Sequence, residues 1–259
     1  MSDVIKTAVI IGTGNVAWHI GRALYNREVK ILQVVGRSAN SAQDIATELY
    51  TSFTTNFVHV NQKADIYIVS VSDDAIPEIC AQLKLSNQLV VHTSGSTPQS
   101  VFEGHFKNYG VLYPFQTFSK YRQLDFSHVP LFIESNSPEN QKRLSELAGR
   151  LSHKTFEISS GIRSRIHLAA VFACNFSNHM YKIAEYILSN ENIDFSVIMP
   201  LINETVAKLS DMKPGDAQTG PAIRNDKYLM EKHLKMLEKE PLLKEIYGIL
   251  SSSIQHKMT

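Results

Sequence analysis

Cysteine, excess charge and long apolar runs are all scarce in this chain. Only two of the 259 residues are cysteines, Cys80 and Cys174, and both lie in apolar sequence. Because a disulfide framework needs more cysteines than this, we predict two buried thiols in a reducing compartment. The 26 basic and 25 acidic residues leave a net charge of +1. Nucleic-acid binding requires a basic excess, so we expect no nucleic-acid partner.

Signals for membranes, secretion and several common chemistries are also absent. No apolar run reaches the roughly 18 residues that a membrane-spanning helix needs. Residues 1–6 lack the basic and apolar regions of a secretory leader. We therefore expect a cytoplasmic protein with no membrane partner. The patterns H-E-x-x-H, paired C-x-x-C, G-x-x-x-x-G-K-S/T and G-x-S-x-G do not occur. Their absence argues against metal, phosphate-loop and serine-hydrolase chemistry.

The most informative pattern that is present is a glycine turn near the start of the chain. It consists of Gly12, Thr13, Gly14, Asn15, Val16 and Ala17. An apolar run precedes it and an apolar helical pattern follows, which is the context in which G-x-G-x-x-G/A binds a dinucleotide. Gly12 permits a tight turn, Gly14 lets the backbone approach a pyrophosphate, and Ala17 allows the helix to pack closely on the strand. An ordinary structural turn is the alternative.

Short apolar runs alternate with helical patterns through the first 160 residues. Strands are expected at Thr7–Ile11, Ile31–Val35, Ile66–Val71, Leu89–His92, Val111–Tyr113, Leu131–Glu134 and Lys154–Ile158. Helices are expected at Ala17–Asn26, Ser41–Leu49 (with Ser41 as its N-cap), Ala75–Leu83 and Pro138–Leu151. This alternation predicts an α/β fold with a doubly wound parallel sheet, whose ligand lies at the carboxyl ends of the strands.

The character of the sequence changes after residue 160. No strand pattern is seen from Ile162 onward, whereas helical patterns cover Arg165–Leu188, Val197–Lys208, Asp226–Glu238 and Pro241–Ile254. We therefore expect two domains. The first is an NAD(P)-binding Rossmann domain over residues 1–160, and the second is an all-helical domain over residues 161–259.

The end of the second expected strand distinguishes the two nicotinamide dinucleotides. NAD-binding proteins carry an acidic residue there, about 20 residues after the glycines, to bind the ribose 2′-hydroxyl. This chain has Arg37 and Ser38 instead. A guanidinium attracts the 2′-phosphate that a carboxylate would repel. We therefore predict an NADP(H) site, with a solvated surface arginine as the alternative.

Two further strand ends supply polar groups to the same edge of the sheet. We expect the cofactor to contact Ser70, Val71, Ser72, Thr93 and Ser94, although Ser72 also suits a helix cap. His92 ends its strand beside these residues and is a candidate for proton transfer. A structural histidine is the alternative at that position.

Candidate substrate groups occur further along the chain. Tyr113 and Gln116 follow the next strand, where they line a pocket or belong to the core. On a regular helix at 100° per residue, His167, Asn175 and Asn178 form a polar stripe. The stripe faces either a substrate or other helices.

A second polar stretch lies near the middle of the expected helical domain. Gln218 and Arg224 flank Gly220-Pro221, where a helical turn would offer N–H groups to an anion. An ordinary capped turn is the alternative. We include Gln218 and Arg224 among the candidate substrate residues.

Taken together, these segments resemble a bacterial family of Rossmann-like NADP oxidoreductases with an uncharacterised C-terminal domain, related to pyrroline-5-carboxylate reductase. The segments that carry the resemblance are Gly12–Ala17, Gly36–Ser38, His92–Ser96, Tyr113–Phe118, His167–His179 and Gln218–Asp226. The resemblance covers nearly the whole chain. It implies a helical domain similar to the C-terminal domain of 6-phosphogluconate dehydrogenase, and a homodimer built through that domain.

One departure from better-known relatives bears on the reaction. β-Hydroxyacid dehydrogenases carry a catalytic lysine four residues before an asparagine that matches Asn175, and this chain has Val171 there. Valine cannot transfer a proton, which disfavours hydroxyacid oxidation and favours imine reduction. We therefore expect hydride transfer between NADP(H) and a small C=N or C=O substrate in the cleft between the domains. His92, His167 and Asn175 are the candidates for polarisation or proton supply. An NADP(H)-binding regulatory or scaffold protein without turnover is the alternative.

Overall fold

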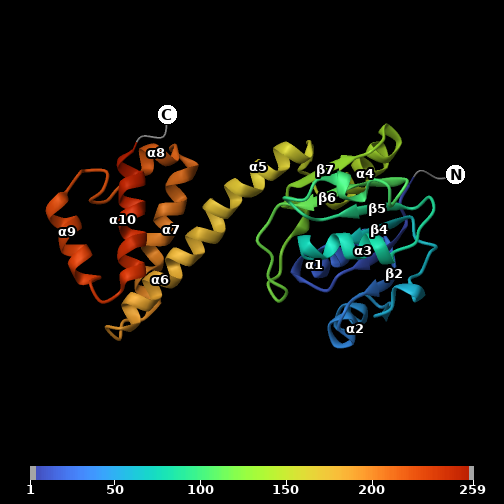
Figure 1. Ribbon diagram of the computed structural model, residues 1–259, viewed down its shortest axis with the longest axis horizontal. Coiled ribbons are helices and arrows are strands. Elements are labelled where there is room, and N and C mark those ends of the chain that lie inside the picture. Colours follow the sequence, from blue (N-terminus) through green and yellow to red (C-terminus); the bar gives the residue numbers. More distant parts are fainter. Residues whose placement is uncertain (1–3, 257–259) are drawn as a thin grey trace. The chain divides into compact units, whose positions relative to one another are not determined.

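The computed structural model describes residues 4–256 and divides into two compact units (Figure 1). The first unit ends at Cys174 and the second begins at Asn175. We expected a boundary near residue 160. The later division arises because the helix that starts at Ser160 is anchored to the first unit by a buried arginine, described below.

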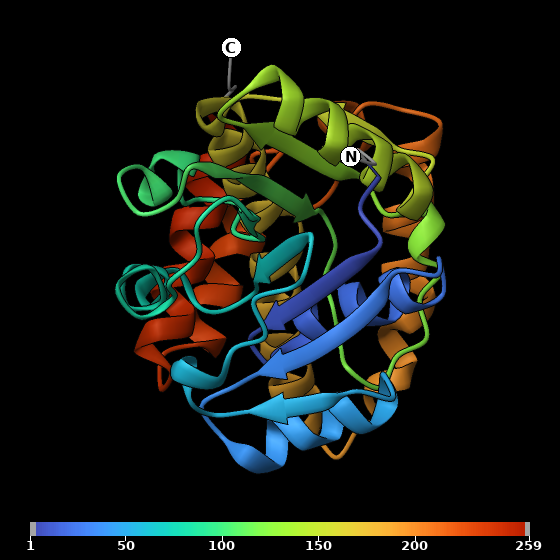
Figure 2. The ribbon, with the colours of Figure 1, turned by 90° about the vertical axis from the view of Figure 1, so that its right-hand side faces the viewer.

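The first unit is built on one eight-stranded sheet with the order β3-β2-β1-β4-β5-β6-β7-β8. The strands are β1 (Thr7–Ile11), β2 (Lys30–Val35), β3 (Ser52–Thr54), β4 (Ile66–Val69), β5 (Leu89–His92), β6 (Asn108–Pro114), β7 (Leu131–Ser135) and β8 (Thr155–Glu157). The arrows of β1, β2 and β3 point the same way in Figure 2. The expectation of a wholly parallel sheet is wrong at one place, because β6 and β7 pair antiparallel. The short strand β3 was not expected.

Helices cover both faces of this sheet, as a doubly wound fold requires. They are α1 (Asn15–Tyr25), α2 (Ala39–Glu48), α3 (Ile76–Gln82) and α4 (Pro138–Leu151), whereas α5 (Ser160–Ala170) follows β8 at the end of this unit. Four short 3-10 turns join the elements: η1 (Phe57–His59), η2 (Asp73–Ala75), η3 (Gln99–Phe102) and η4 (Phe126–His128). The predicted Rossmann-like architecture is therefore confirmed.

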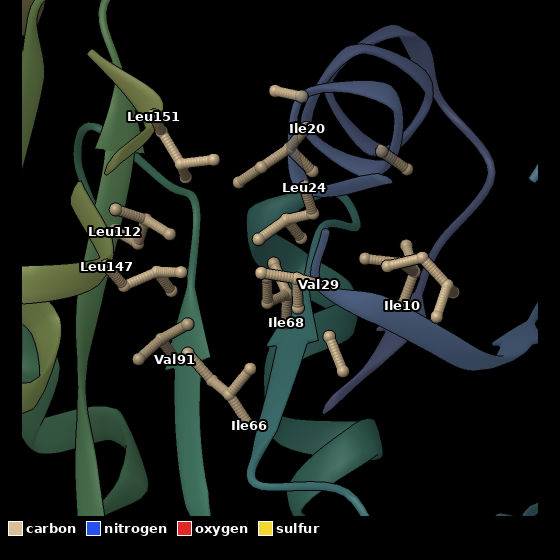
Figure 3. Close-up of a cluster of buried hydrophobic side chains, with 14 of the residues drawn as sticks. Ile10, Ile20, Leu24, Val29, Ile66, Ile68, Val91, Leu112, Leu147 and Leu151 are labelled. Atoms are coloured by element: carbon tan, nitrogen blue, oxygen red, sulfur yellow. The ribbon is translucent and has the colours of Figure 1, made fainter. Parts of the chain in front are cut away.

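The core forms because successive strand residues point to opposite faces and both faces are apolar. Ile10 and Ile68 join one buried cluster with Ile20 of α1 and Leu147 of α4 (Figure 3). Their strand neighbours join a second cluster with Ile79 of α3. Full burial of each such side chain contributes about 1.5–3 kcal/mol. The two clusters hold the carboxyl ends of β1, β4 and β5 at fixed positions, which matters for the site below.

The start of α2 corrects a local prediction. The helix begins at Ala39, and its N-cap is Ser38, whose hydroxyl accepts a hydrogen bond from the Ser41 amide at 3.5 Å. We expected Ser41 to be the cap. Both are serines with equal capping ability, so which serine becomes the N-cap depends on how soon after the end of β2 the chain turns into a helix.

The second unit contains helices, turns and loops and no strand among its described residues, in keeping with the predicted helical domain. It contains α6 (Ser177–Ser189), α7 (Met199–Ala207), α8 (Pro214–Ala217), α9 (Lys227–Met236) and α10 (Pro241–Gln255), with 3-10 turns η6 (Phe195–Ile198) and η7 (Lys208–Ser210). Among residues 4–256, no helix is long and apolar enough to span a bilayer. The segment after Pro221 forms a turn and not a helix.

Apolar side chains of the second unit are largely uncovered. Between residues 175 and 256, Ala222 alone is buried among the described hydrophobic residues. Cys174, just before this unit, is exposed, whereas Cys80 is buried. The prediction of two buried thiols is therefore wrong for Cys174, because no residue among 4–256 covers its side chain.

The helix that joins the two units is not a regular α-helix. A π-helical segment, Val171–Phe176, separates α5 from α6. Hydrogen bonds in a π turn close from i to i+5, so each turn holds an extra residue. The extra residue rotates every later side chain relative to an α-helix. The polar stripe of His167, Asn175 and Asn178, which assumed 100° per residue, is therefore not a stripe on one regular helix face.

Candidate functional site

The glycine turn lies between β1 and α1, where it was predicted. Gly12 has φ +122°, and a Cβ there would lie 2.0 Å from the carbonyl oxygen of Ser70. Only glycine fits. Gly14 is the N-cap of α1, with no side-chain cap and open space where a Cβ would be. Ala17 is fully buried against the sheet. The first N–H groups of α1 therefore face open space at the positive end of the helix dipole, as a bound pyrophosphate requires.

The neighbouring strand end is shaped to meet this turn. A Cβ on Gly36 would lie 2.5 Å from Cγ2 of Thr13, so the small residue lets the two loops approach. Arg37 and Ser38 follow and are both exposed. No ion pair is formed by the Arg37 side chain within residues 4–256, which leaves its guanidinium free for a phosphate. These features fit the phosphate groups of NADP(H).

Loops after β4 and β5 continue the same edge of the sheet. Thr93 Oγ1 donates to Ser70 Oγ at 3.1 Å. Ser94 Oγ accepts from the amides of Ser96 at 3.2 Å and Thr97 at 2.9 Å. The structure thus brings the candidate cofactor residues of both loops together.

Asp73 ties the two loops together. Its carboxylate accepts a hydrogen bond from Ser96 Oγ. Partial burial by itself raises the pKa of Asp73, but hydrogen bonds from Ser96, Ser94 and Thr97 outweigh it and hold the pKa below its ordinary value. The carboxylate therefore stays charged at neutral pH and keeps the loops closed on each other.

His92 is fully buried at the end of β5. Its Nδ1 accepts a hydrogen bond from the Ser94 amide at 3.2 Å, so the neutral ring carries its proton on Nε2. Burial, with the charge of Arg163 as a second cause, lowers the pKa of His92 to about 4. At neutral pH the ring is uncharged. His92 contacts the candidate cofactor loop through the Ser94 amide. A role for His92 in proton transfer stays a prediction.

A buried arginine, which the sequence analysis missed, anchors α5 beneath these loops. The Arg163 side chain is 1% exposed. Its Nη1 donates to Glu134 Oε2 at 2.7 Å, and its Nη2 donates to the carbonyl of Thr97 at 2.6 Å. Ser160 completes the group through hydrogen bonds from its amide at 2.9 Å and its hydroxyl at 2.5 Å to Glu134. A single arginine in a helical pattern resembles a surface residue, so the sequence held no signal for it.

One turn further along α5, His167 meets Tyr113 at the carboxyl end of β6. The Tyr113 hydroxyl and His167 Nδ1 are 3.0 Å apart and hydrogen-bonded. A Cβ on Gly95 would lie 2.6 Å from that Nδ1 and 2.8 Å from Cζ of Tyr113, so glycine is needed there too. Burial raises the pKa of Tyr113 to about 12. The phenol is therefore protonated at neutral pH and shares a proton with a half-buried imidazole beside the loop of Thr93 and Ser94.

The remaining candidates are placed less centrally. Gln116 is exposed and its side chain accepts from the Thr117 amide at 2.8 Å. Asn175, Asn178, Gln218 and Arg224 belong to the second unit, where all four are exposed. Their assignment to the site stays a prediction.

Residues 115–125, which we call the strap, lie directly against the glycine turn. Asn15 Nδ2 donates to the carbonyl of Phe118 at 2.9 Å, and Asn15 Oδ1 accepts from the Lys120 amide at 3.2 Å. His19 Nε2 lies 2.9 Å from the carbonyl of Ser119. The amide of Asn15, predicted to contact cofactor, is thus engaged by the strap. This contact could not be predicted from local sequence patterns, because the partners are more than a hundred positions apart.

Comparison with known proteins identifies both halves of the chain. Residues 7–95 match the family described as NADP oxidoreductase coenzyme F420-dependent, and residues 129–254 match the domain of unknown function DUF2520. A candidate NADP oxidoreductase from Bacteroides fragilis is 42% identical over 99% of this chain and 100% of its own, with a TM-score of 0.94. No curated protein is similar enough to match.

More distant solved structures share the fold. A 1-pyrroline-5-carboxylate reductase from Streptococcus pyogenes is 15% identical, covering 98% of this chain and 99% of its own, with a TM-score of 0.64. An imine reductase from Myxococcus stipitatus in complex with NADP+ is also 15% identical, covering 96% of this chain and 93% of its own, with a TM-score of 0.67.

Proposed function

The chain belongs to the NADP oxidoreductases that join a dinucleotide-binding domain to DUF2520, and we propose that it reduces a small C=N or C=O compound with NADP(H). The observation that carries the proposal is the hydrogen-bonded pair of Tyr113 and His167 at the edge of the sheet where the glycine turn lies. Reduction of either bond needs a hydride and a proton. Bound NADPH supplies the hydride, and the protein must supply the proton.

The residues at this edge of the sheet have separate roles in cofactor binding, proton supply and positioning. Gly12 and Gly14 admit the pyrophosphate to the start of α1, and Arg37 pairs with the 2′-phosphate. The pair of Tyr113 and His167 holds a proton between Oη and Nδ1 and delivers it to the nitrogen or oxygen of the substrate. Arg163 fixes α5 against the loop of Thr97 and so positions His167.

The substrate class that we propose follows from the absence of a lysine at position 171. If Asn175 matches the asparagine of hydroxyacid dehydrogenases, as the resemblance implies, Val171 stands where those enzymes carry their lysine, and an alcohol then has no strong base to deprotonate it. An imine nitrogen is itself basic and needs only a weak donor such as a phenol. A small cyclic imine is therefore the substrate class that we favour, as in the imine and pyrroline-5-carboxylate reductases that share the fold. Asn175 stays a candidate for polarising the substrate.

The test is NADPH oxidation with a panel of cyclic imines and keto acids. Tyr113→Phe should lower kcat by roughly 10²–10⁴-fold, the usual contribution of a positioned proton donor, while NADPH binding stays unchanged. Tyr109→Phe, on the same strand and with no hydrogen bond from its hydroxyl among residues 4–256, is the matched control. Tight NADPH binding with no turnover on any compound would favour a regulatory protein. Full activity of Tyr113→Phe would remove the tyrosine from the mechanism.

We also propose that the protein is a homodimer held by its second unit. Leu201 and Ile249 are 65% and 61% exposed, and other large apolar side chains of α6, α7 and α10 are exposed as well: Tyr186, Ile187, Met199, Val206, Leu242 and Leu250. A helical unit with so little buried apolar surface is not stable alone. A second copy supplies the same apolar faces through a twofold axis, as the family resemblance implies.

Charge placed on that face should break the dimer. Leu201→Glu should convert a dimer to a monomer or to unfolded material in sedimentation, because an ionised carboxylate cannot be buried unpaired. Val58→Glu introduces the same charge at an 84% exposed site in the first unit and serves as the control. A wild-type chain that sediments as a folded monomer would contradict the proposal.

A further inference from the structure

A second cavity lies on the first unit, away from the glycine turn. It has a volume of about 570 Å³ and is walled by the second half of α1, by residues 122–127 and by Leu151 of α4. Arg22, on its wall, lies seven residues after Asn15 and so about 10 Å along the helix from the end that faces the cofactor. The size is that of a site for a small molecule.

Basic side chains outnumber acidic ones in the lining. Three guanidinium groups line the cavity: Arg22, Arg27 and Arg122. Arg22 has an exposed ion pair with Glu48 at 3.4 Å, whereas the other two have no acidic partner within the described part of the chain. Asp125 is the one acid in the lining, and its carboxylate is taken by Ser127 and His128.

The surroundings do not cancel this charge. The end of α1 would place negative carbonyl dipoles near the cavity, but the carbonyls of Arg22, Leu24 and Tyr25 accept hydrogen bonds from the amides of Asn26, Arg27 and Glu28. Guanidinium forks bind phosphate oxygens two at a time. The amides of Asn26 and Gln123 add neutral donors.

We propose that this cavity binds a small, phosphate-bearing polyanion and that its occupancy tightens the dinucleotide site. Arg22 lies on α1 and Arg27 lies just after its end, whereas Arg122 follows the strap residues that hold Asn15 and His19. An anion shared between them draws the strap onto α1. The strap contacts the first residue of α1, so the same closure rigidifies the turn of Gly12 and Gly14. Linkage then requires that cofactor and anion strengthen each other's binding. This coupling rests on the proposed function, but anion binding does not.

The only tryptophan of the chain reports on the strap. Trp18 lies on α1, and Lys120 Nζ lies 4.7 Å from its ring centroid. Closure of the strap should therefore change Trp18 fluorescence. Inorganic tripolyphosphate is the probe, titrated into the full-length protein at constant ionic strength so that general screening does not vary. We expect saturable binding of one probe per chain, by fluorescence and by calorimetry.

Arginine variants locate the probe. Arg27→Gln and Arg122→Gln should each weaken probe binding roughly tenfold or more, as loss of a charge-assisted hydrogen bond predicts. Both side chains are exposed, so the fold should survive. Arg165→Gln removes the same charge from an exposed site on α5 and should change nothing. Binding that does not saturate, or that survives the Arg122 change, would overturn the proposal.

The effect on NADP+ separates the two sites. Bound tripolyphosphate should raise the affinity for NADP+ severalfold, and this gain should vanish in Arg122→Gln. Competition between probe and NADP+ would place the probe at the start of α1 and overturn the proposal. Probe binding with no effect on NADP+ affinity would overturn the coupling. Probe binding in a protein that never binds NADP+ would refute the proposed function and leave the anion site standing.

Discussion

Arg163→Leu should lower the free energy of unfolding by about 3–5 kcal/mol, the usual effect of removing one partner of a buried ion pair. The change leaves the Glu134 carboxylate, with a side chain 15% exposed, without its cation. It also leaves the carbonyl of Thr97 without a donor. Denaturant unfolding at one fixed protein concentration measures the effect, because a dimer's stability depends on concentration.

A double variant distinguishes pairing from packing. Arg163→Leu combined with Glu134→Leu removes both charges and should recover a large part of the lost stability, because two apolar side chains need no partners. Losses that simply add would show that the two residues act independently. In folded protein, Arg163→Leu should also lower kcat more than NADPH affinity, because His167 loses its anchor while Gly12 and Arg37 keep theirs. A loss below about 1 kcal/mol would contradict the anchoring role.

Arg37→Asp should weaken NADPH binding by roughly 30- to 160-fold relative to NADH, which corresponds to about 2–3 kcal/mol for a charged hydrogen bond. The variant replaces attraction for the 2′-phosphate with repulsion. NADH lacks this phosphate, so its affinity should change little. Equilibrium titration of both dinucleotides against wild type and variant gives the ratio directly.

Two further measurements test whether Arg37 recognises the 2′-phosphate. Arg37→Gln removes the charge without reversing it and should give an intermediate ratio. The preference of the wild type for NADPH should weaken as salt rises, because Arg37 is exposed and screened. Equal losses for NADPH and NADH in Arg37→Asp would mean that the arginine supports the loop and does not recognise the phosphate.

Local sequence patterns predicted those parts of the fold that local forces decide. The bounds of β1, β5 and α4 were predicted to the residue, because each has a clear apolar period and clear end signals such as Ser137 before Pro138. The glycine turn was found because φ at Gly12 and the approach to Ser70 allow one residue type only. That restriction is visible in the sequence itself.

Features that depend on distant partners could not be predicted in this way. The antiparallel direction of β7 relative to β6 depends on how the folded chain brings the two strand edges together. The apolar pattern of a strand does not indicate its direction relative to a neighbour. Arg163 differs from a surface arginine only through Glu134 and Thr97, which the fold brings to it. The π-helical segment Val171–Phe176 contains no glycine or proline, so no sequence signal indicated an irregular helix there. Cys174 has apolar neighbours in the sequence, which predicted burial, but its side chain is exposed in the described part of the chain.

The reversal of β7 has a further consequence for how the site is assembled. In register, Glu134 lies opposite Val111 and Leu131 lies opposite Pro114, so β7 leads the chain back to the amino ends of its neighbours. β8 runs parallel to β7, and its last residue, Glu157, lies opposite Ile133, which pairs with Leu112 of β6. The helix α5 therefore begins near the level of Val111, where Arg163 bonds Glu134, and His167 lies one turn further toward the carboxyl end of β6. Four residues of helix rise about 6 Å, close to the two strand residues from Val111 to Tyr113. If β7 ran parallel to β6, the chain would leave the sheet beyond the carboxyl end of β6. His167 would then lie away from Tyr113.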